Sequence, residues 1–268
     1  MRGFNFSSNR WLFAMRAAGA HLVASGIVIS LLAYVAFSTW FVQPWGEISG
    51  GMGILLLVLC VDVVCGPILT LIVFDPKKEK KELLMDLGFI LVLQLTALGY
   101  GVHTLSQTHP LAIVFEVDRF RAVGYADLDE SEADRWPEWV NPWTLSAPRV
   151  LAARRAHTGE EKFASIDASL QGVEPGQRPS WWQDYQSQVP EVLVKSRSVV
   201  DLNARRPDQS NVLQNSLQKA VQTALDSETK NPDELRWLPL VSRKSTDWVV
   251  IIDPVTARIR GYSHVDGF

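Results

Sequence analysis

The chain has 268 residues, of which 47% are hydrophobic, and a formal net charge of -3. These averages would suit a soluble protein of one or two domains, and the slight acidity gives no indication of a nucleic-acid partner. The basic residues are unevenly spread, however, because no Lys or Arg lies between Arg16 and Lys77 or between Lys81 and Arg119. Such blocks exclude an ordinary soluble chain and are typical of a membrane protein.

Three apolar windows occupy these gaps, at 18–41, 52–74 and 83–105. Each holds roughly 20 residues or slightly more, enough for a helix to cross a hydrocarbon core of about 30 Å. The windows lack the polar face of a soluble helix, so the sequence predicts three transmembrane helices. The first is too long for the core of a signal peptide, and we expect a retained anchor. Trp40 and Trp45 suit the outer membrane interface.

The basic residues predict the orientation of these helices. Those of the first 105 residues are Arg2, Arg10, Arg16, Lys77, Lys78, Lys80 and Lys81. Because positive residues stay on the cytoplasmic side of a membrane, we expect the tail 1–17 and the loop 75–82 in the cytoplasm. Residues 106–268 then form a domain on the opposite side.

Asp62 lies near the middle of the second window, where a charge costs about 2.5–3.5 kcal/mol, so it should face protein rather than lipid. Gly66 and Thr70 follow at helical spacing and continue a stripe of small or polar groups, which indicates a packing face. Pro67 removes a backbone donor and predicts a kink.

Small and polar residues that could face Asp62 also occur in the other windows: Gly26, Ser30 and Ala33 in the first, and Gly88, Gln94, Thr96 and Gly99 in the third. One interpretation is structural, with Asp62 bonded to Gln94 or Ser30 inside the bundle. A second makes Asp62 an acceptor for the membrane helix of another protein. A proton or ion path is the weakest alternative, because the histidines of this region, His21 and His103, lie near the helix ends.

The C-terminal part reads as an α+β domain with an antiparallel sheet. Residues 111–125 alternate like one strand, 237–241 form another, and 248–262 form a hairpin around Asp253-Pro254. An amphipathic helix is expected over 212–225 with Ser210 as its cap, and shorter helices over 149–156 and 161–170.

Two tryptophan clusters, at 136–143 and 179–185, suggest packing under loops, or a peptide groove, a sugar platform or a contact with the outer leaflet. No catalytic, metal-binding or phosphate-binding motif is evident, so we expect neither an enzyme nor a cofactor.

Several segments resemble the type IV pilin accessory proteins of the TfpX/TfpZ type. They are RAAG at Arg16, EISGG at Glu47, VDVVCGP at Val61, LTLIVFDPKK at Leu69, VFEVDRFRAV at Val114, LPL at Leu238 and VIIDPVTARIRGY at Val250. The resemblance runs nearly end to end and is least distinctive over 126–209.

The resemblance implies a bacterial inner-membrane protein with a periplasmic C-terminal domain. It also implies a non-enzymatic role in the assembly or dynamics of type IV pili, with pilin or the inner-membrane pilus machinery as partner. No catalytic residue is carried over. The positions we expect to contact a partner are Asp62, Gly66, Pro67, Thr70, Ser30 and Gln94 in the membrane, and Glu47, Ser49 and Gly50 in the loop after the first helix. The rival interpretation is a membrane-anchored sensor that signals through a separate partner, because its cytoplasmic pieces are too short for an output module.

Overall fold

The computed structural model describes residues 8–268, and Arg2, with the rest of the expected tail up to residue 7, lies outside them. The chain divides into two compact units. The helical unit comprises the residues up to Val42 together with Gly51–Ser106, and the α/β unit comprises Gln43–Gly50 together with Gln107–Phe268.

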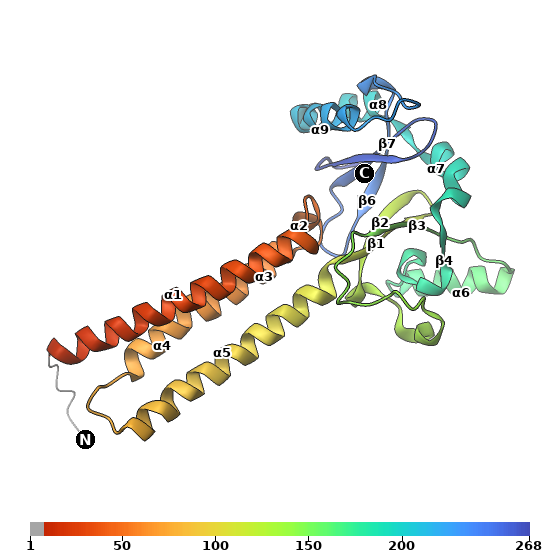
Figure 1. Ribbon diagram of the computed structural model, residues 1–268. Coiled ribbons are helices and arrows are strands. Elements are labelled where there is room, and N and C mark those ends of the chain that lie inside the picture. The colour runs from red at the N-terminus through yellow and green to blue at the C-terminus, as the bar shows by residue number, and fades with distance from the viewer. Residues whose placement is uncertain (1–7) are drawn as a thin grey trace. The chain divides into compact units, whose positions relative to one another are not determined.

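Three apolar helical segments make up the helical unit (Figure 1). Its elements are α1 (Ser8–Thr39), α3 (Gly51–Leu59), a π-helical turn (Cys60–Cys65), α4 (Gly66–Val73) and α5 (Lys80–Thr108). Arg10–Thr39, Gly51–Val73 and Lys80–Thr108 are each long and apolar enough to cross a membrane. The three predicted windows therefore coincide with helices, although α1 begins well before residue 18.

The α/β unit contains short helices around one sheet. Its strands are β1 (Pro110–Glu116), β2 (Arg119–Gly124), β3 (Arg149–Ala153), β4 (Trp182–Asp184), β5 (Arg197–Ser198), β6 (Arg236–Val241), β7 (Trp248–Ile252) and β8 (Ile259–Ser263). Its helices are α2 (Trp45–Ile48), α6 (Gly159–Leu170), α7 (Val189–Lys195), α8 (Val199–Arg205) and α9 (Ser210–Gln222).

The sheet is mixed, which corrects the prediction of an antiparallel sheet. In the described residues the sheet has eight strands: seven follow the order β4-β3-β1-β2-β6-β7-β8, and the eighth, β5, pairs with β6. The hairpins are antiparallel, but β1 is parallel to β3 and β2 is parallel to β6. Parallel pairs need long connections, so their partners are distant in sequence and leave no local pattern.

Residues 111–125 form a hairpin rather than one strand. Glu116 of β1 pairs with Arg119 of β2 across the two-residue loop Val117-Asp118. Val117 has a φ of 52°, in the left-handed region that β-branched residues avoid. Hairpin loops of this length usually carry Gly or Asn, so the turn left no signal in the sequence.

The expected helix at 149–156 is also wrong, because Arg149–Ala153 is strand β3. It lies between β1 and β4, and Ala152 is completely buried opposite Phe115. Pairing within the sheet therefore overrides the local helical preference of this segment. The helix predicted over 161–170 is present as α6.

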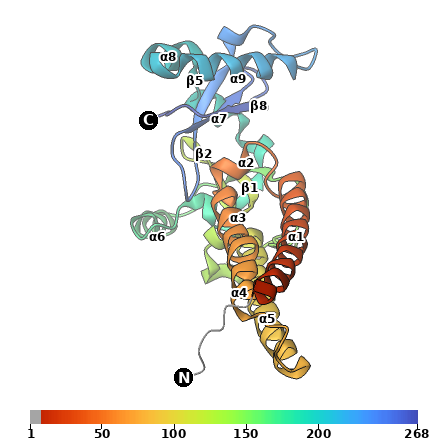
Figure 2. The same ribbon diagram turned by 90° about the vertical axis from the view of Figure 1, so that its left-hand side faces the viewer.

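The long amphipathic helix is present as α9, although Ser210 is its first residue and Gln209 occupies the cap position. Leu213, Leu217 and Ala220 are buried on one face. They pack with residues of α8, β6 and β7, so α8 and α9 cover the same face of these strands (Figure 2).

Four of the five tryptophans in the two clusters are packed against other residues, and the fifth, Trp143, is exposed. The rings of Trp139 and Trp182 stack with centroids 5.5 Å apart, and Trp136 meets Tyr125 edge-on at 5.7 Å. Trp181 is buried as well. Trp136, Trp139 and Trp182 pack against the residues of β1 and β3 rather than forming an open platform.

A buried cluster of charges fixes the closing hairpin. Oδ1 of Asp253 accepts hydrogen bonds from two backbone N–H groups of the turn, and Oδ2 lies 3.2 Å from Arg260. Glu228 lies 3.3 Å from Arg260 and also accepts hydrogen bonds from Arg258. The hydrogen bonds from Arg258 lower the pKa of Glu228 to about 2.

Candidate partner-binding site

Asp62 lies in the π-helical turn Cys60–Cys65 that joins α3 to α4. The N–H of Gly66 donates to the carbonyl of Val61, as the wider turn requires. Pro67 follows as the second residue of α4, and it has no N–H to continue the hydrogen-bond ladder of the preceding turn. Where a kink was expected at Pro67, the structure has a π-helical turn directly before α4, a feature frequent at functional sites.

The carboxylate of Asp62 is buried but incompletely hydrogen-bonded. The residue is 5% exposed, and its Oδ1 has no hydrogen-bond partner among residues 8–268. Nε2 of Gln94 on α5 donates to the main-chain carbonyl of Asp62 at 3.1 Å, not to the carboxylate. An unpaired buried acceptor costs about 1–3 kcal/mol, so this one calls for an explanation beyond stability.

Gly66 provides the space that this contact needs. A Cβ atom at Gly66 would lie 2.1 Å from Nε2 of Gln94. The stripe Asp62, Gly66 and Thr70 is buried along its whole length, together with Pro67. It therefore faces the inside of the helical unit.

His21 joins this stripe from α1. Its Nδ1 lies 2.6 Å from Oγ1 of Thr70. The hydropathy pattern places His21 near a helix end and therefore does not indicate it as a site residue. Because α1 already begins at Ser8, His21 lies well inside the helix. Its helical spacing could have identified it, because His21 lies on the inner face of α1 together with Ala14, Ser25 and Ile29.

A cavity of about 260 Å³ opens between α1, α4 and α5 beside these polar groups. Its lining residues are Ala17, His21, Thr70, Leu87, Ile90, Leu91 and Gln94. The lining thus combines apolar side chains with three polar ones, His21, Thr70 and Gln94, a composition found in binding sites.

Some expected stripe residues lie elsewhere. Ser30 is exposed, whereas Ser25 and Ile29 of the same helix turn inward, so Ser30 is not a partner of Asp62. Among the residues that the structure describes, no other segment lies within 4 Å of a Cβ position at Gly88 or Gly99, and the close approach occurs instead at Gly101, which packs against Val58. The sequence predicts which small residues lie in α1 and α5, but it does not predict the direction in which each points around the helix axis. Thr96 is exposed as well.

The loop after α1 belongs to the α/β unit. Trp45 and Ile48 of α2 are buried in its core, and the Trp45 ring meets Tyr262 edge-on at 4.8 Å. Oγ of Ser242 donates to the carbonyl of Ile48 at 2.6 Å. Trp45 is therefore a core residue, which corrects its expected place at the membrane interface.

The three site residues expected in this loop differ in their environment. Glu47 is exposed and Ser49 is half-buried. Gly50 has a φ of 79°, which favours glycine, and a Cβ atom there would lie 2.7 Å from Cδ of Lys244. Of these three residues, Glu47 is accordingly the one whose side chain is exposed.

Comparison with known proteins identifies the family. A family model described as "Fimbrial assembly protein FimB" matches residues 9–50. The fimbrial assembly proteins of serogroups I and E1 of Dichelobacter nodosus are each 32% identical to this chain over 251 residues, which cover 92% of this chain and 93% of each relative.

A shorter fimbrial assembly protein, of serogroups C1 and C2 of Dichelobacter nodosus, is 36% identical over 122 residues, covering 46% of this chain and 93% of that relative. No solved structure matches the chain. The agreement over nearly the whole length shows that this chain belongs to the fimbrial assembly proteins, the type IV pilus accessory family that its motifs resemble.

Proposed function

We propose that this protein is a non-catalytic accessory protein of the bacterial inner membrane, which binds pilin or the pilus machinery and modulates the assembly or dynamics of type IV pili. Membership of the fimbrial assembly family supports the process. The distribution of Lys and Arg supports a cytoplasmic N-terminus and a periplasmic α/β unit.

The cavity between α1, α4 and α5 carries the proposal that a membrane helix binds here. Within a bilayer, polar side chains need polar partners because lipid offers none. His21, Thr70 and Gln94 line the cavity, and Gln94 also contacts the residue whose carboxylate retains a free acceptor. The helix of a partner with a polar or charged group would satisfy these side chains and fill the apolar walls.

Site-specific photo-crosslinking in living cells tests this assignment. Leu91 lines the cavity, whereas Phe89, two residues away on α5, is exposed and does not. A photoreactive residue at position 91 should therefore give an adduct with pilin that is much stronger than the adduct from position 89. Equal yields at both positions, or adducts only between copies of this protein, would contradict the proposal.

A further inference from the structure

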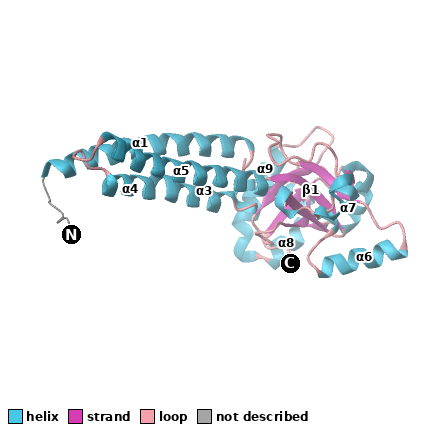
Figure 3. Ribbon diagram, turned by 90° about the horizontal axis from the view of Figure 1, so that it is seen from below, coloured by secondary structure: helices cyan, strands magenta, loops and turns pink. Residues whose placement is uncertain are grey.

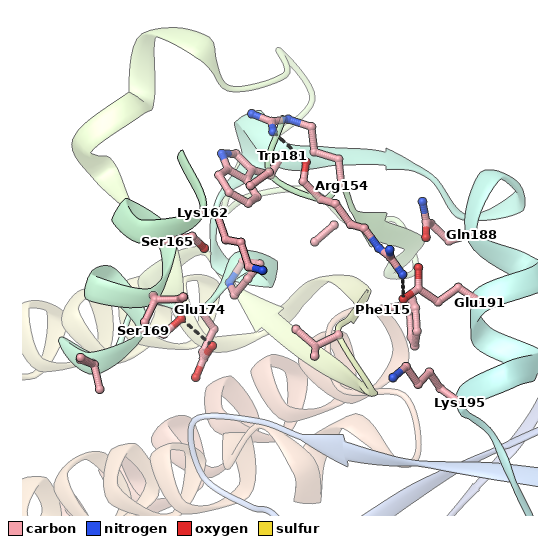
Figure 4. A pocket seen from close by; sticks show the side chains of 17 residues that line it. Phe115, Arg154, Lys162, Ser165, Ser169, Glu174, Trp181, Gln188, Glu191 and Lys195 are labelled. Carbon is pink, nitrogen blue, oxygen red and sulfur yellow. Dashed lines mark hydrogen bonds and ion pairs between the residues drawn. The ribbon is translucent and has the colours of Figure 1, made fainter. Parts of the chain in front are cut away.

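The α/β unit carries a second, larger cavity on its surface, of about 820 Å³ (Figure 4). Phe115 and Trp181 form part of its apolar lining, and α6, α7 and the end of β3 supply side chains around it. The volume lies within the range of ligand-binding pockets.

The charges around this cavity favour an anionic occupant. Arg154 pairs with Glu161 at 2.6 Å, and Arg155 pairs with Glu191. The ammonium groups of Lys162 on α6 and Lys195 on α7 point into the cavity in Figure 4, and they make no ion pair among the described residues. Glu174 is the remaining carboxylate of the lining, and Ser169 donates a hydrogen bond to it.

This positive cavity stands out against the rest of the α/β unit, because the chain beyond residue 106 carries 19 basic and 23 acidic residues. Complementary charge steers a partner to its surface and selects against the opposite sign. Lys162 and Lys195 therefore predict carboxylates on the occupant rather than a neutral ligand.

Large apolar side chains in the lining of the same cavity are exposed. Ile166 and Leu170 of α6 are 50% and 83% exposed, and Val117 at the tip of the β1–β2 hairpin is 64% exposed. In Figures 1 and 3, α6 lies at the periphery of the α/β unit. Exposed apolar groups gathered around a cavity mark an interaction site.

Val117 adds an independent observation. Its left-handed backbone conformation is strained for a β-branched residue, and a glycine there would relieve the strain. The structure nevertheless has a large apolar side chain at this exposed turn, where it lines the cavity.

We propose that this cavity binds an acidic, amphipathic polypeptide segment of a partner protein. The apolar side chains of the segment would contact Val117, Ile166 and Leu170, and its carboxylates would pair with Lys162 and Lys195. This proposal is independent of the cavity in the helical unit, and either can fail without the other.

Peptide binding to the full-length protein in lipid nanodiscs tests the proposal. Three peptides of about ten residues carry the same neutral fluorophore and alternate Leu with Glu, Leu with Lys, or Ser with Glu. Fluorescence anisotropy should show that the Leu/Glu peptide binds at least about tenfold more tightly than either of the others, because only it matches both charge and apolar surface. Equal affinities for the Leu/Glu and Leu/Lys peptides, or no binding at millimolar peptide, would overturn it.

Charge reversal locates the binding. The double variant K162E/K195E should bind the Leu/Glu peptide about tenfold more weakly and the Leu/Lys peptide more tightly. K219E on α9 should change neither affinity. Thermal unfolding of each variant checks that it is folded. An unchanged preference in K162E/K195E would overturn the proposal.

Two other occupants are distinguished in the same preparations. Leu170→Ser should weaken the Leu/Glu peptide without changing the oligomeric state. Loss of a dimer in Leu170→Ser would make the occupant a second copy of this chain and overturn the proposal. Binding of phosphatidylglycerol vesicles that depends on Lys162 and Lys195, without peptide binding, would assign the site to lipid and also overturn it.

Discussion

Each unit of this protein buries a carboxylate, and the two carboxylates differ in their hydrogen bonding. In the α/β unit, Asp253 accepts hydrogen bonds from backbone N–H groups on both oxygens and pairs with Arg260. In the helical unit, Oδ1 of Asp62 has no partner among the described residues, although the residue is almost as buried. A saturated acid stabilises its own fold, whereas an unsaturated one is available to a second molecule.

The largest effect is expected from removing the saturated acid. Asp253→Ala leaves Arg260 buried without one of its counter-ions and should lower the free energy of unfolding by about 3–5 kcal/mol. Chemical unfolding of the purified protein, followed by tryptophan fluorescence, measures this loss. Asp247→Asn is the control, because its pair with His264 is exposed and should contribute little. A loss as small as that of the control would remove the distinction between the two acids.

The same charge cluster predicts that the free energy of unfolding decreases at low pH. Because the pKa of Glu228 is lowered to about 2 in the folded protein, its contribution is complete above the ordinary pKa of about 4.5. It should be lost progressively as the pH falls from about 4.5 toward 2. Glu228→Gln should make the unfolding free energy less dependent on pH in that window. An unchanged slope in the variant would show that other groups cause the acid sensitivity.

In the helical unit, Gly66→Ala should have a moderate effect. The new methyl group displaces the Gln94 side chain and breaks its hydrogen bond to the carbonyl of Asp62, at a cost of about 1–3 kcal/mol. Thermal unfolding in detergent measures the change, with Gly88→Ala as the control because, apart from its neighbours and helix backbone, no atom of the described residues lies within 4 Å of its Cβ position. If the clash is the cause, adding Gln94→Ala should make Gly66→Ala nearly neutral.

The smallest change in stability and the clearest change in function are expected from Asp62→Asn. The substitution preserves shape and leaves the hydrogen bond from Gln94 to the backbone intact, so stability should change by less than about 1 kcal/mol. Piliation and twitching of the host bacterium should nevertheless fall. Normal pili in this variant, or a loss of stability as large as that of Asp253→Ala, would favour a purely structural Asp62.

Patterns that repeat along one segment were predictable from the sequence. Hydropathy located the three helices, turn residues located the hairpin at Asp253, and helical spacing placed Asp62, Gly66 and Thr70 on one buried face. These features depend on residues within about one or two turns of each other. Membership of the fimbrial assembly proteins was also recognisable, because the motifs carrying the resemblance extend along the chain.

Features that depend on distant contacts were not predictable. Ser25 of α1 turns inward and Ser30 outward because α1 packs against α3 and α4, which lie elsewhere in the sequence. The parallel pair of β1 with β3 converts an expected helix into a strand. The cavity around Lys162 and Lys195 is built from segments that only the folded sheet brings together.

The loop after α1 has a consequence for any attempt to isolate the α/β unit. A fragment starting at Gln107 would lack Trp45 and Ile48, and Tyr262 would lose its aromatic neighbour. Ser242 donates a hydrogen bond to the carbonyl of Ile48, and during synthesis Ile48 emerges from the ribosome 194 residues before Ser242. The short connector between the first two helices therefore cannot form its final contacts until almost the entire polypeptide has been translated.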